Sequence, residues 1–201
     1  MTHVERDLAG RIVALVSPTG LRTSYSYDAC GRMVDVTDPA GRVTRYSYTS
    51  DFQVATVTYP TGETARYEYD AMGRVVLSHV PGAGVSQYRY DPCGRLVFSC
   101  DLVYGQRHFS YDLAGQLVAA TNPAGGVSRY GYDRCGRLVT RTDPGGGLTT
   151  YQYNECGQMI AATDPLGRVT EYTWDKSGTL AAITRPDGTV VSRRLGPKGV
   201  E

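Results

Sequence analysis

The sequence has no long apolar run and no excess of charge of either sign. No segment approaches the roughly 18 apolar residues of a membrane-spanning helix. The first ten residues contain no apolar run of signal-peptide length. We therefore expect neither a transmembrane segment nor a Sec signal in this chain. Its 21 basic and 20 acidic residues give a net charge of +1, which disfavours nucleic acid as a partner.

Patterns typical of catalytic, metal and cofactor sites are also missing. The three histidines, His3, His79 and His108, are scattered along the chain. No cysteine or histidine spacing matches that of a metal site. The glycines from Gly145 to Gly147 lack the Lys-Ser/Thr pair and the following helix of a phosphate-binding loop. We predict no catalytic residue, no metal site and no cofactor, and therefore a chain that is not an enzyme.

What the sequence does contain is a repeat of 21 residues. Its clearest copy, YGYDRCGRLVTRTDPGG, runs from Tyr130 to Gly146. The defining residues of this copy are two aromatic side chains, a first turn, an apolar residue and a second turn: Tyr130, Tyr132, Asp133, Gly136, Arg137, Leu138, Asp143, Pro144 and Gly146. The first-turn glycine recurs as Gly10, Gly31, Gly73, Gly94, Gly115, Gly136, Gly157, Gly178 and Gly199, and Phe52 alone breaks the series.

Each repeat reads as a β-hairpin. Aromatic residues alternate with small or polar ones, which is the periodicity of a strand, and Asp-x-x-Gly is typical of a type I turn followed by a glycine bulge. In the second copy this geometry predicts three cross-strand pairs: Asp28 with Arg32, Tyr27 with Met33, and Ser26 with Val34. Tyr25, Tyr27 and Met33 would then share one face of the sheet, and Ser24 and Ser26 the other.

The two aromatic slots hold 14 of the 16 tyrosines. The residue between the slots varies without regard to polarity, as expected of an outward position, so the aromatics should face inward. We predict an all-β fold of tandem 21-residue hairpins that form a curved, spiralling antiparallel sheet. It would comprise about nine repeats in one domain over residues 5–195, with irregular ends at residues 1–4 and 196–201. We expect local irregularity at Asp51-Phe52, Tyr59-Pro60, Val80-Pro81-Gly82 and Leu102 to Gly105, without a domain boundary.

Four of the five cysteines, Cys30, Cys93, Cys135 and Cys156, occupy the position before the turn glycine. Equivalent positions on successive hairpins lie two strand spacings apart, roughly 9–10 Å. That separation exceeds the about 7 Å Cα limit for a disulfide. We therefore predict free thiols on turns.

The pattern Y-x-Y-D-x-x-G-R-L-V followed by D-P-x-G resembles the YD repeat of the Rhs family, which the C components of bacterial Tc toxins and the shells of animal teneurins share. The resemblance covers residues 5 to about 192. It implies a section of a β-sheet shell that, in bacterial polymorphic toxins, encloses a C-terminal toxin domain. The implied partners are the rest of a larger shell and that toxin domain, in a secreted or cell-surface protein. The family's self-cleavage aspartates have no counterpart here, and Asp143 and Asp164 are expected to be turn residues.

An alternative hypothesis is a module that binds glycans on a cell surface, because regularly spaced aromatics also mark cell-wall-binding repeats of about 20 residues. Those repeats have a Gly-Trp…Trp-Tyr-Tyr pattern, whereas this chain has one tryptophan and a different turn. The two hypotheses differ in the exposure they require. Tyrosines that stack on sugars must be accessible, whereas those of a shell should be packed against aliphatic side chains.

Overall fold

A computed structural model describes residues 2–192. All the elements in this range are antiparallel β-strands joined by short turns, so the predicted fold class is confirmed. By their contacts, the described residues group into two compact units, which divide between Gln106 and Arg107. The single domain expected over residues 5–195 stays a prediction. β1 begins at His3, two residues before the start of that predicted domain.

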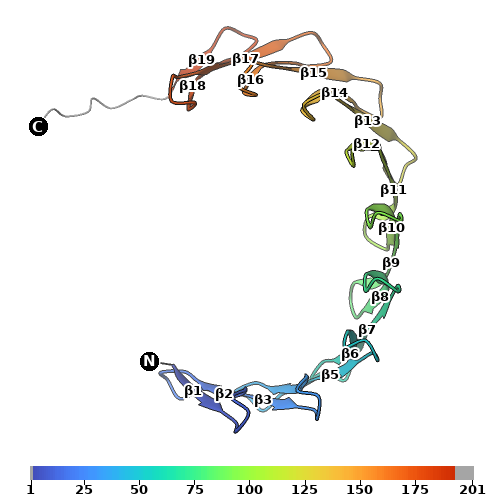
Figure 1. The fold of residues 1–201 in the computed structure, drawn as a ribbon, viewed down its shortest axis with the longest axis vertical. Coiled ribbons are helices and arrows are strands. Elements are labelled where there is room, and N and C mark those ends of the chain that lie inside the picture. The colour runs from blue at the N-terminus through green and yellow to red at the C-terminus, as the bar shows by residue number, and fades with distance from the viewer. Residues whose placement is uncertain (1, 193–201) are drawn as a thin grey trace, which may run out of the picture. The chain divides into compact units, whose positions relative to one another are not determined.

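Unit 1 is a meander in which each strand pairs with the next one along the chain (Figure 1). Its strands are β1 (His3–Arg6), β2 (Ile12–Val16), β3 (Arg22–Tyr27), β4 (Met33–Thr37), β5 (Val43–Tyr48), β6 (Val54–Thr58), β7 (Thr64–Tyr69), β8 (Val75–Val80), β9 (Gly84–Tyr90) and β10 (Leu96–Asp101).

Unit 2 repeats this meander from β11, whose first two residues fall in unit 1. Its strands are β11 (Gly105–Tyr111), β12 (Leu117–Thr121), β13 (Val127–Tyr132), β14 (Leu138–Thr142), β15 (Leu148–Tyr153), β16 (Met159–Thr163), β17 (Val169–Trp174), β18 (Leu180–Thr184) and β19 (Val190–Ser192). Among the described residues, β19 pairs only with β18.

Each unit is a single layer with few fully buried side chains. In the described part of the chain, the buried apolar residues are Ala14, Ala65 and Phe98. The aromatic side chains in the slots from Tyr25 to Trp174 are all half-buried, whereas the residue between the two slots is exposed in each of these copies except at Gly131. This supports the predicted sorting of the two faces. A hollow lined by Ile12, Leu15, Tyr25, Tyr27 and Met33 confirms that the aromatics share a face with the aliphatic residues.

The first turn has the predicted backbone geometry. The N–H of Asp28 donates to the carbonyl of Arg32 at 2.9 Å, and Gly31, with φ of 80°, donates to the carbonyl of Asp28 at 3.0 Å. Tyr27 lies opposite Met33, as predicted. Glycine is favoured at the fourth position because an L side chain is strained at this φ.

The predicted pairing of Ser26 with Val34 is wrong. Ser26 lies opposite Asp35, because a β-bulge inserts Val34 as an extra residue into β4. The same register shift recurs in every described hairpin whose two strands are joined by a first turn, including the hairpin that pairs Tyr132 with Leu138. In a bulge two residues face one partner, which explains why two adjacent apolar residues open the second strand of each copy, as Met33-Val34 and Leu138-Val139 do.

The expected irregularities occur at three of the four positions. The turns at Val80–Gly84 and Asp101–Gly105 are altered, with Gly82, Gly84 and Gly105 all at positive φ. Tyr59-Pro60 is regular, contrary to the prediction: Tyr59 N–H donates to the Glu63 carbonyl at 2.8 Å, as the aspartates do in other copies. Proline and glycine fix this turn, so the first residue need not be aspartate.

Phe52 is the one non-glycine residue with positive φ in the described chain, at 66°. This conformation costs an L residue about 1–2 kcal/mol. The Phe52 ring also lies 5.1 Å from the Arg32 guanidinium carbon, an exposed contact that offsets part of the strain.

We predict that Phe52→Gly is more stable to urea unfolding than Phe52→Ala by about 1 kcal/mol. Both variants lose the ring contact with Arg32, so their difference isolates the backbone strain. Unfolding followed by circular dichroism measures it. If the alanine variant is as stable as the glycine variant, position 52 is not strained in solution.

Candidate functional site

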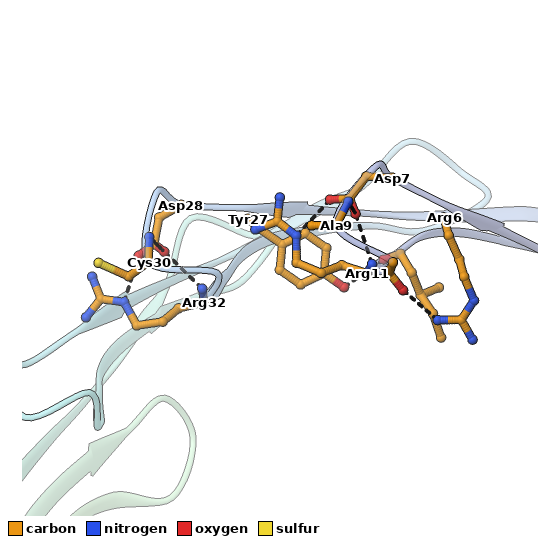
Figure 2. Close-up of polar contacts among 10 residues, drawn as sticks. Arg6, Asp7, Ala9, Arg11, Tyr27, Asp28, Cys30 and Arg32 are labelled. Atoms are coloured by element: carbon orange, nitrogen blue, oxygen red, sulfur yellow. Dashed lines mark hydrogen bonds and ion pairs between the residues drawn. The ribbon is translucent and has the colours of Figure 1, made fainter.

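The most regular chemical feature of the chain is a set of side-chain contacts that begins at the first turn of each repeat. In the clearest copy, Asp133 Oδ1 accepts the N–H groups of Cys135 and Arg137, at 2.9 and 3.0 Å. Arg137 Nε donates to Asp133 Oδ2 at 2.7 Å. Five first turns show this Asp–Arg ion pair: Asp7–Arg11, Asp28–Arg32, Asp70–Arg74, Asp91–Arg95 and Asp133–Arg137. Figure 2 shows the first two of them.

The first-turn arginine also reaches the next repeat. Arg137 Nη1 donates to the carbonyl of Asn154 at 3.1 Å, and its guanidinium carbon lies 5.0 Å from the centre of the Tyr153 ring. Arg11, Arg32 and Arg74 stack in the same way on the second aromatic of the following repeat, at 4.6–4.8 Å. In Figure 2, Arg11 lies beside the Tyr27 ring. The arginine therefore joins one hairpin to the next.

A second inter-repeat contact comes from the second aromatic slot. Tyr132 donates its hydroxyl to the carbonyl of Leu117 at 2.9 Å, and Tyr153 donates to that of Leu138 at 2.8 Å. We call this contact the aromatic latch: a donor from the second slot to the carbonyl 15 residues earlier. Its seven recorded examples, at 2.5–3.0 Å, are Tyr27–Ile12, Tyr48–Met33, Tyr69–Val54, Tyr90–Val75, Tyr132–Leu117, Tyr153–Leu138 and Trp174–Met159.

The latch was missed in the sequence analysis, although the sequence carries a signal for it. In the eight copies from Tyr27 to Trp174 the second slot holds tyrosine or tryptophan, both of which have a donor hydrogen. The first slot accepts Phe109, which has none. Each acceptor carbonyl belongs to the residue directly before the bulge, so the latch binds the backbone where the ladder is interrupted.

The residues predicted to define the repeat lie in one hairpin and its two turns. Tyr130 and Tyr132 are on β13, Asp133 and Gly136 are in the first turn, and Leu138 opens β14. In the second turn, Asp143 Oδ1 accepts the N–H groups of Gly145 and Gly147, at 2.9 and 2.8 Å. Pro144 is its second residue, and Gly146 has φ of 87°. Their importance for function stays a prediction.

The first and second turns differ in how far their arginines are covered. The Arg137 side chain is 31% exposed, whereas Arg42 and Arg168, which pair with second-turn aspartates, are 68% and 61% exposed. Exposed ion pairs contribute little to stability. Aromatic rings cover first-turn arginines such as Arg32 and Arg137. We therefore expect the first-turn pairs to contribute more to stability than the second-turn pairs.

The turn geometry lowers the pKa of four first-turn aspartates, Asp28, Asp70, Asp91 and Asp133. For Asp28, Asp91 and Asp133 the largest cause is the backbone N–H of the arginine four residues on, which donates to the carboxylate. For Asp70 it is the side-chain hydrogen bond from Arg74. A carboxyl group whose pKa is lower in the folded than in the unfolded chain binds protons more weakly when folded. It therefore stabilises the fold at neutral pH, and this contribution is lost as the pH falls below about 4.

We predict that the Asp133→Asn variant loses less thermal stability than the wild type between about pH 6 and about pH 3. Asparagine keeps the acceptor oxygen for the turn, as Asn154 does in the next copy, but does not titrate. Melting curves at both pH values measure the difference. Glu68→Gln, which removes an exposed carboxylate outside the turns, is the control. Equal losses for wild type and Asp133→Asn would contradict the role of this carboxylate.

The cysteines are free, as predicted, and Cys30, Cys93, Cys135 and Cys156 are exposed. Between residues 2 and 192, no cluster of three or more His, Cys, Asp or Glu side chains could hold a metal ion. The same range contains no helix that is long and apolar enough to cross a membrane.

Comparisons with known proteins agree with the repeat. No curated protein matches the sequence. Among solved structures, the crystal structure of TcdB2-TccC3 has a TM-score of 0.74 at 19% identity, over 94% of this chain and 12% of that chain. TcdB2-TccC3 without its hypervariable C-terminal region gives 0.72 at 19% identity, over 92% and 11%. The Photorhabdus luminescens Tc holotoxin pore gives 0.58 at 14% identity, over 92% and 13%.

The TM-scores show a shared fold, and this chain spans only 11–13% of the length of those structures. The assignment to a family rests on the sequence itself. The family model for the teneurin YD-shell matches residues 2–92 and, in an overlapping match, residues 21–188. The chain therefore belongs to the teneurin YD-shell family, the YD-repeat family that its sequence pattern resembles.

Proposed function

We propose that this chain is a non-catalytic section of a β-sheet shell that encloses or scaffolds a toxin polypeptide. The observation that carries the proposal is the continuity of the inter-repeat contacts. In hairpin after hairpin, the turn arginine and the second aromatic bind the neighbouring hairpin. Contacts of this kind hold successive hairpins together in one sheet, as the wall of a shell requires.

The proposed partners are the remaining repeats of a larger shell and an enclosed C-terminal toxin domain. The similarity to TcdB2-TccC3, of which this chain matches 12% of the length, supports a section of something larger. By the same reasoning, we propose that the complete protein is secreted or displayed at the cell surface.

The first-turn carboxylates already make hydrogen bonds within their own turns, which supports a non-catalytic role. The first-turn carboxylates accept backbone N–H groups and their own arginine, as Asp133 does. His3, His79 and His108 lie on different strands, β1, β8 and β11. A general base and a nucleophile would have to lie within hydrogen-bond reach of each other.

The exposure of the tyrosines favours the shell over the glycan-binding alternative. The ring of Tyr153 is half-buried, its hydroxyl donates to Leu138 and the Arg137 guanidinium lies over its face. A ring that is covered by a cation and anchored through its hydroxyl offers a sugar little free surface.

Protease protection in the full-length protein tests the proposal. The protein that contains this chain would be digested with trypsin, beside its C-terminal segment expressed alone. We expect the segment to survive within the full-length protein and to be degraded when isolated. Equal rates of degradation, or a full-length gene without any segment beyond the repeats, would overturn the proposal.

A further inference from the structure

A hollow lies between two neighbouring second turns of unit 1. It has a volume of about 460 Å³ and is lined by Arg42, Tyr59, Pro60, Thr61 and Glu63. Arg42 directly precedes β5, and the other four residues belong to the turn between β6 and β7. We call this depression the Tyr59 hollow. It brings an aromatic ring and side chains of both charges together at one place on the surface.

The turn from Tyr59 to Glu63 has the backbone of a regular second turn but different side chains. Tyr59 N–H donates to the Glu63 carbonyl at 2.8 Å, as Asp38 N–H does to the Arg42 carbonyl at 3.0 Å in the turn before it. The first and fifth positions therefore hold aspartate and arginine in one turn, and tyrosine and glutamate in the next. A carboxylate–arginine pair is replaced by a ring and a carboxylate.

The two charges at the hollow are not equally compensated. Arg42 Nε donates to Asp38 Oδ2 at 2.7 Å, and Arg42 Nη2 lies 2.7 Å from the same oxygen. Glu63 Oε2 accepts the uncharged hydroxyl of Thr61 at 3.1 Å. Among residues 2–192, no cation lies within ion-pair distance of Glu63. Because Asp38 and Arg42 cancel, the hollow keeps the negative charge of Glu63, and the occupant that complements it is a cation.

The ring of Tyr59 lacks the contacts that occupy the slot tyrosines. Tyr59 and Tyr104 are the two tyrosines outside the slots. In the described part of the chain, no arginine lies over the half-buried Tyr59 ring and its hydroxyl makes no hydrogen bond. Tyr153, in contrast, donates to the Leu138 carbonyl and is covered by Arg137. The Tyr59 ring is therefore available to a ligand.

Elsewhere in the chain, an arginine lies between such a ring and such a carboxylate. Arg137 Nε donates to Asp133 Oδ2 at 2.7 Å, and its guanidinium carbon lies 5.0 Å from the centre of the Tyr153 ring. A guanidinium suits both groups because it is planar, always charged and able to stack on an aromatic face. The Tyr59 hollow offers the ring and the carboxylate without an arginine that bridges them.

Tyr59 lies on the face of the sheet that carries the aromatic slots. Tyr46 is opposite Val57, so Val57 is on that face, and Tyr59, two residues further on, is on the same side. Burial is the main cause of a raised pKa of Tyr67, a first-slot residue, and the neighbouring Tyr59 adds to it. This is the face that we expect to be directed inward.

We propose that the Tyr59 hollow binds an arginine side chain of another polypeptide, with the guanidinium over the Tyr59 ring and hydrogen-bonded to the Glu63 carboxylate. The ring selects arginine over lysine, whose compact ammonium is more strongly hydrated. The inference rests on the proposed function for the source of the arginine, which is the polypeptide that the shell encloses or scaffolds. It deepens that function by naming one contact between the wall and this polypeptide.

NMR titration of the full chain with short peptides tests the site. The probe is the peptide GGRGG, blocked at both ends. We expect the amide signals of Thr61, Gly62 and Glu63 to shift saturably. A peptide with citrulline in place of arginine has nearly the same shape without the charge, so it should bind roughly fivefold more weakly or worse. The lysine peptide GGKGG should also bind more weakly than GGRGG.

Three outcomes of these titrations would overturn the proposal. They are the absence of binding, shifts that avoid the turn from Tyr59 to Glu63, and an affinity for the citrulline or lysine peptide equal to that for GGRGG. Agmatine supplies the same guanidinium without a polypeptide. If agmatine binds more tightly than GGRGG, the occupant is a small guanidinium compound and the polypeptide is excluded.

Protein variants locate the contact. Glu63→Gln keeps the shape of the side chain and should weaken binding of GGRGG roughly threefold or more. Glu68→Gln, which removes an exposed carboxylate outside the turns, is the matched control and should bind as the wild type does. The double substitution Tyr59→Asp with Glu63→Arg reproduces the side chains of the Asp38–Arg42 turn, so it should fold and lose binding. Wild-type affinity in Glu63→Gln or in the double variant would overturn the proposal.

The peptide controls need no protein variant, so they decide the matter even if a variant fails to fold. Failure of this inference is also separable from failure of the proposed function. A toxin segment protected within the full-length protein, together with no binding of GGRGG, would leave the shell intact and remove only the arginine site. Binding of GGRGG without protection of that segment would remove the enclosed polypeptide as the source of the arginine.

Discussion

Replacement of Tyr153 by alanine is expected to destabilise the sheet by about 2–4 kcal/mol, and replacement by phenylalanine by about 1 kcal/mol. Phenylalanine keeps the ring and its contact with Arg137 but removes the hydroxyl that donates to Leu138. Alanine removes the ring and both of these contacts. A fully buried aromatic costs about 3–5 kcal/mol on truncation to alanine, and the lower range here reflects a ring that is half-buried.

The matched control is Tyr151→Phe on the same strand. Tyr151 occupies the first aromatic slot, which is also half-buried and which holds Phe109 in another repeat. We expect its loss of stability to be within about 0.5 kcal/mol of zero. Urea unfolding followed by circular dichroism measures all three variants. If Tyr151→Phe and Tyr153→Phe cost the same, the latch contributes nothing and the preference for tyrosine in the second slot has another cause.

The sequence predicted the elements of the fold because its signals are local. Glycine at position 31 and aspartate at position 28 specify a turn, and the alternation of Tyr25 and Tyr27 with serine specifies a strand. These features depend on a few neighbouring residues, so the pairing of Tyr27 with Met33 followed from counting residues outward from the turn.

The same counting failed one residue further on, at the bulge. The pair Met33-Val34 was interpreted as the start of an alternating strand, whereas two adjacent apolar residues facing one partner are typical of a bulge. Its recurrence as Leu138-Val139 and Val75-Val76 carried the necessary information. A strict period of two was the wrong template for these strands.

The contacts between repeats could not be predicted from the period alone. Spacing shows that Arg137 and Tyr153 are 16 residues apart, but their meeting depends on how far one hairpin is staggered against the next. That stagger follows from the bulge and from the twist of the strands. The pairing of Asp28 with Arg32 in one turn could be predicted from their spacing. The hydrogen bond from Arg137 to the Asn154 carbonyl of the next repeat could not.

Gly136→Val is expected to destabilise the fold by about 1–3 kcal/mol, because it places a β-branched residue at φ of 82°. The added Cβ would lie 3.1 Å from Gln116 Nε2, which also donates to the Gly136 carbonyl. That amide is the end of a flexible side chain and can move aside. Backbone strain, and not a clash, should therefore account for most of the loss.

Two comparisons separate these causes. Gly146→Val has a similar φ of 87° but no atom within 4 Å of the added Cβ, so it should cost nearly as much as Gly136→Val if strain dominates. Arg134→Val, at a position that holds Leu113 and Ala71 in other copies, should change stability by less than about 0.5 kcal/mol. Urea unfolding measures all three. Equal losses for Gly136→Val and Arg134→Val would mean that the first turn does not hold its glycine at positive φ. A small loss for Gly146→Val beside a large one for Gly136→Val would instead assign the cost to the Gln116 contact, and so to the link between neighbouring repeats.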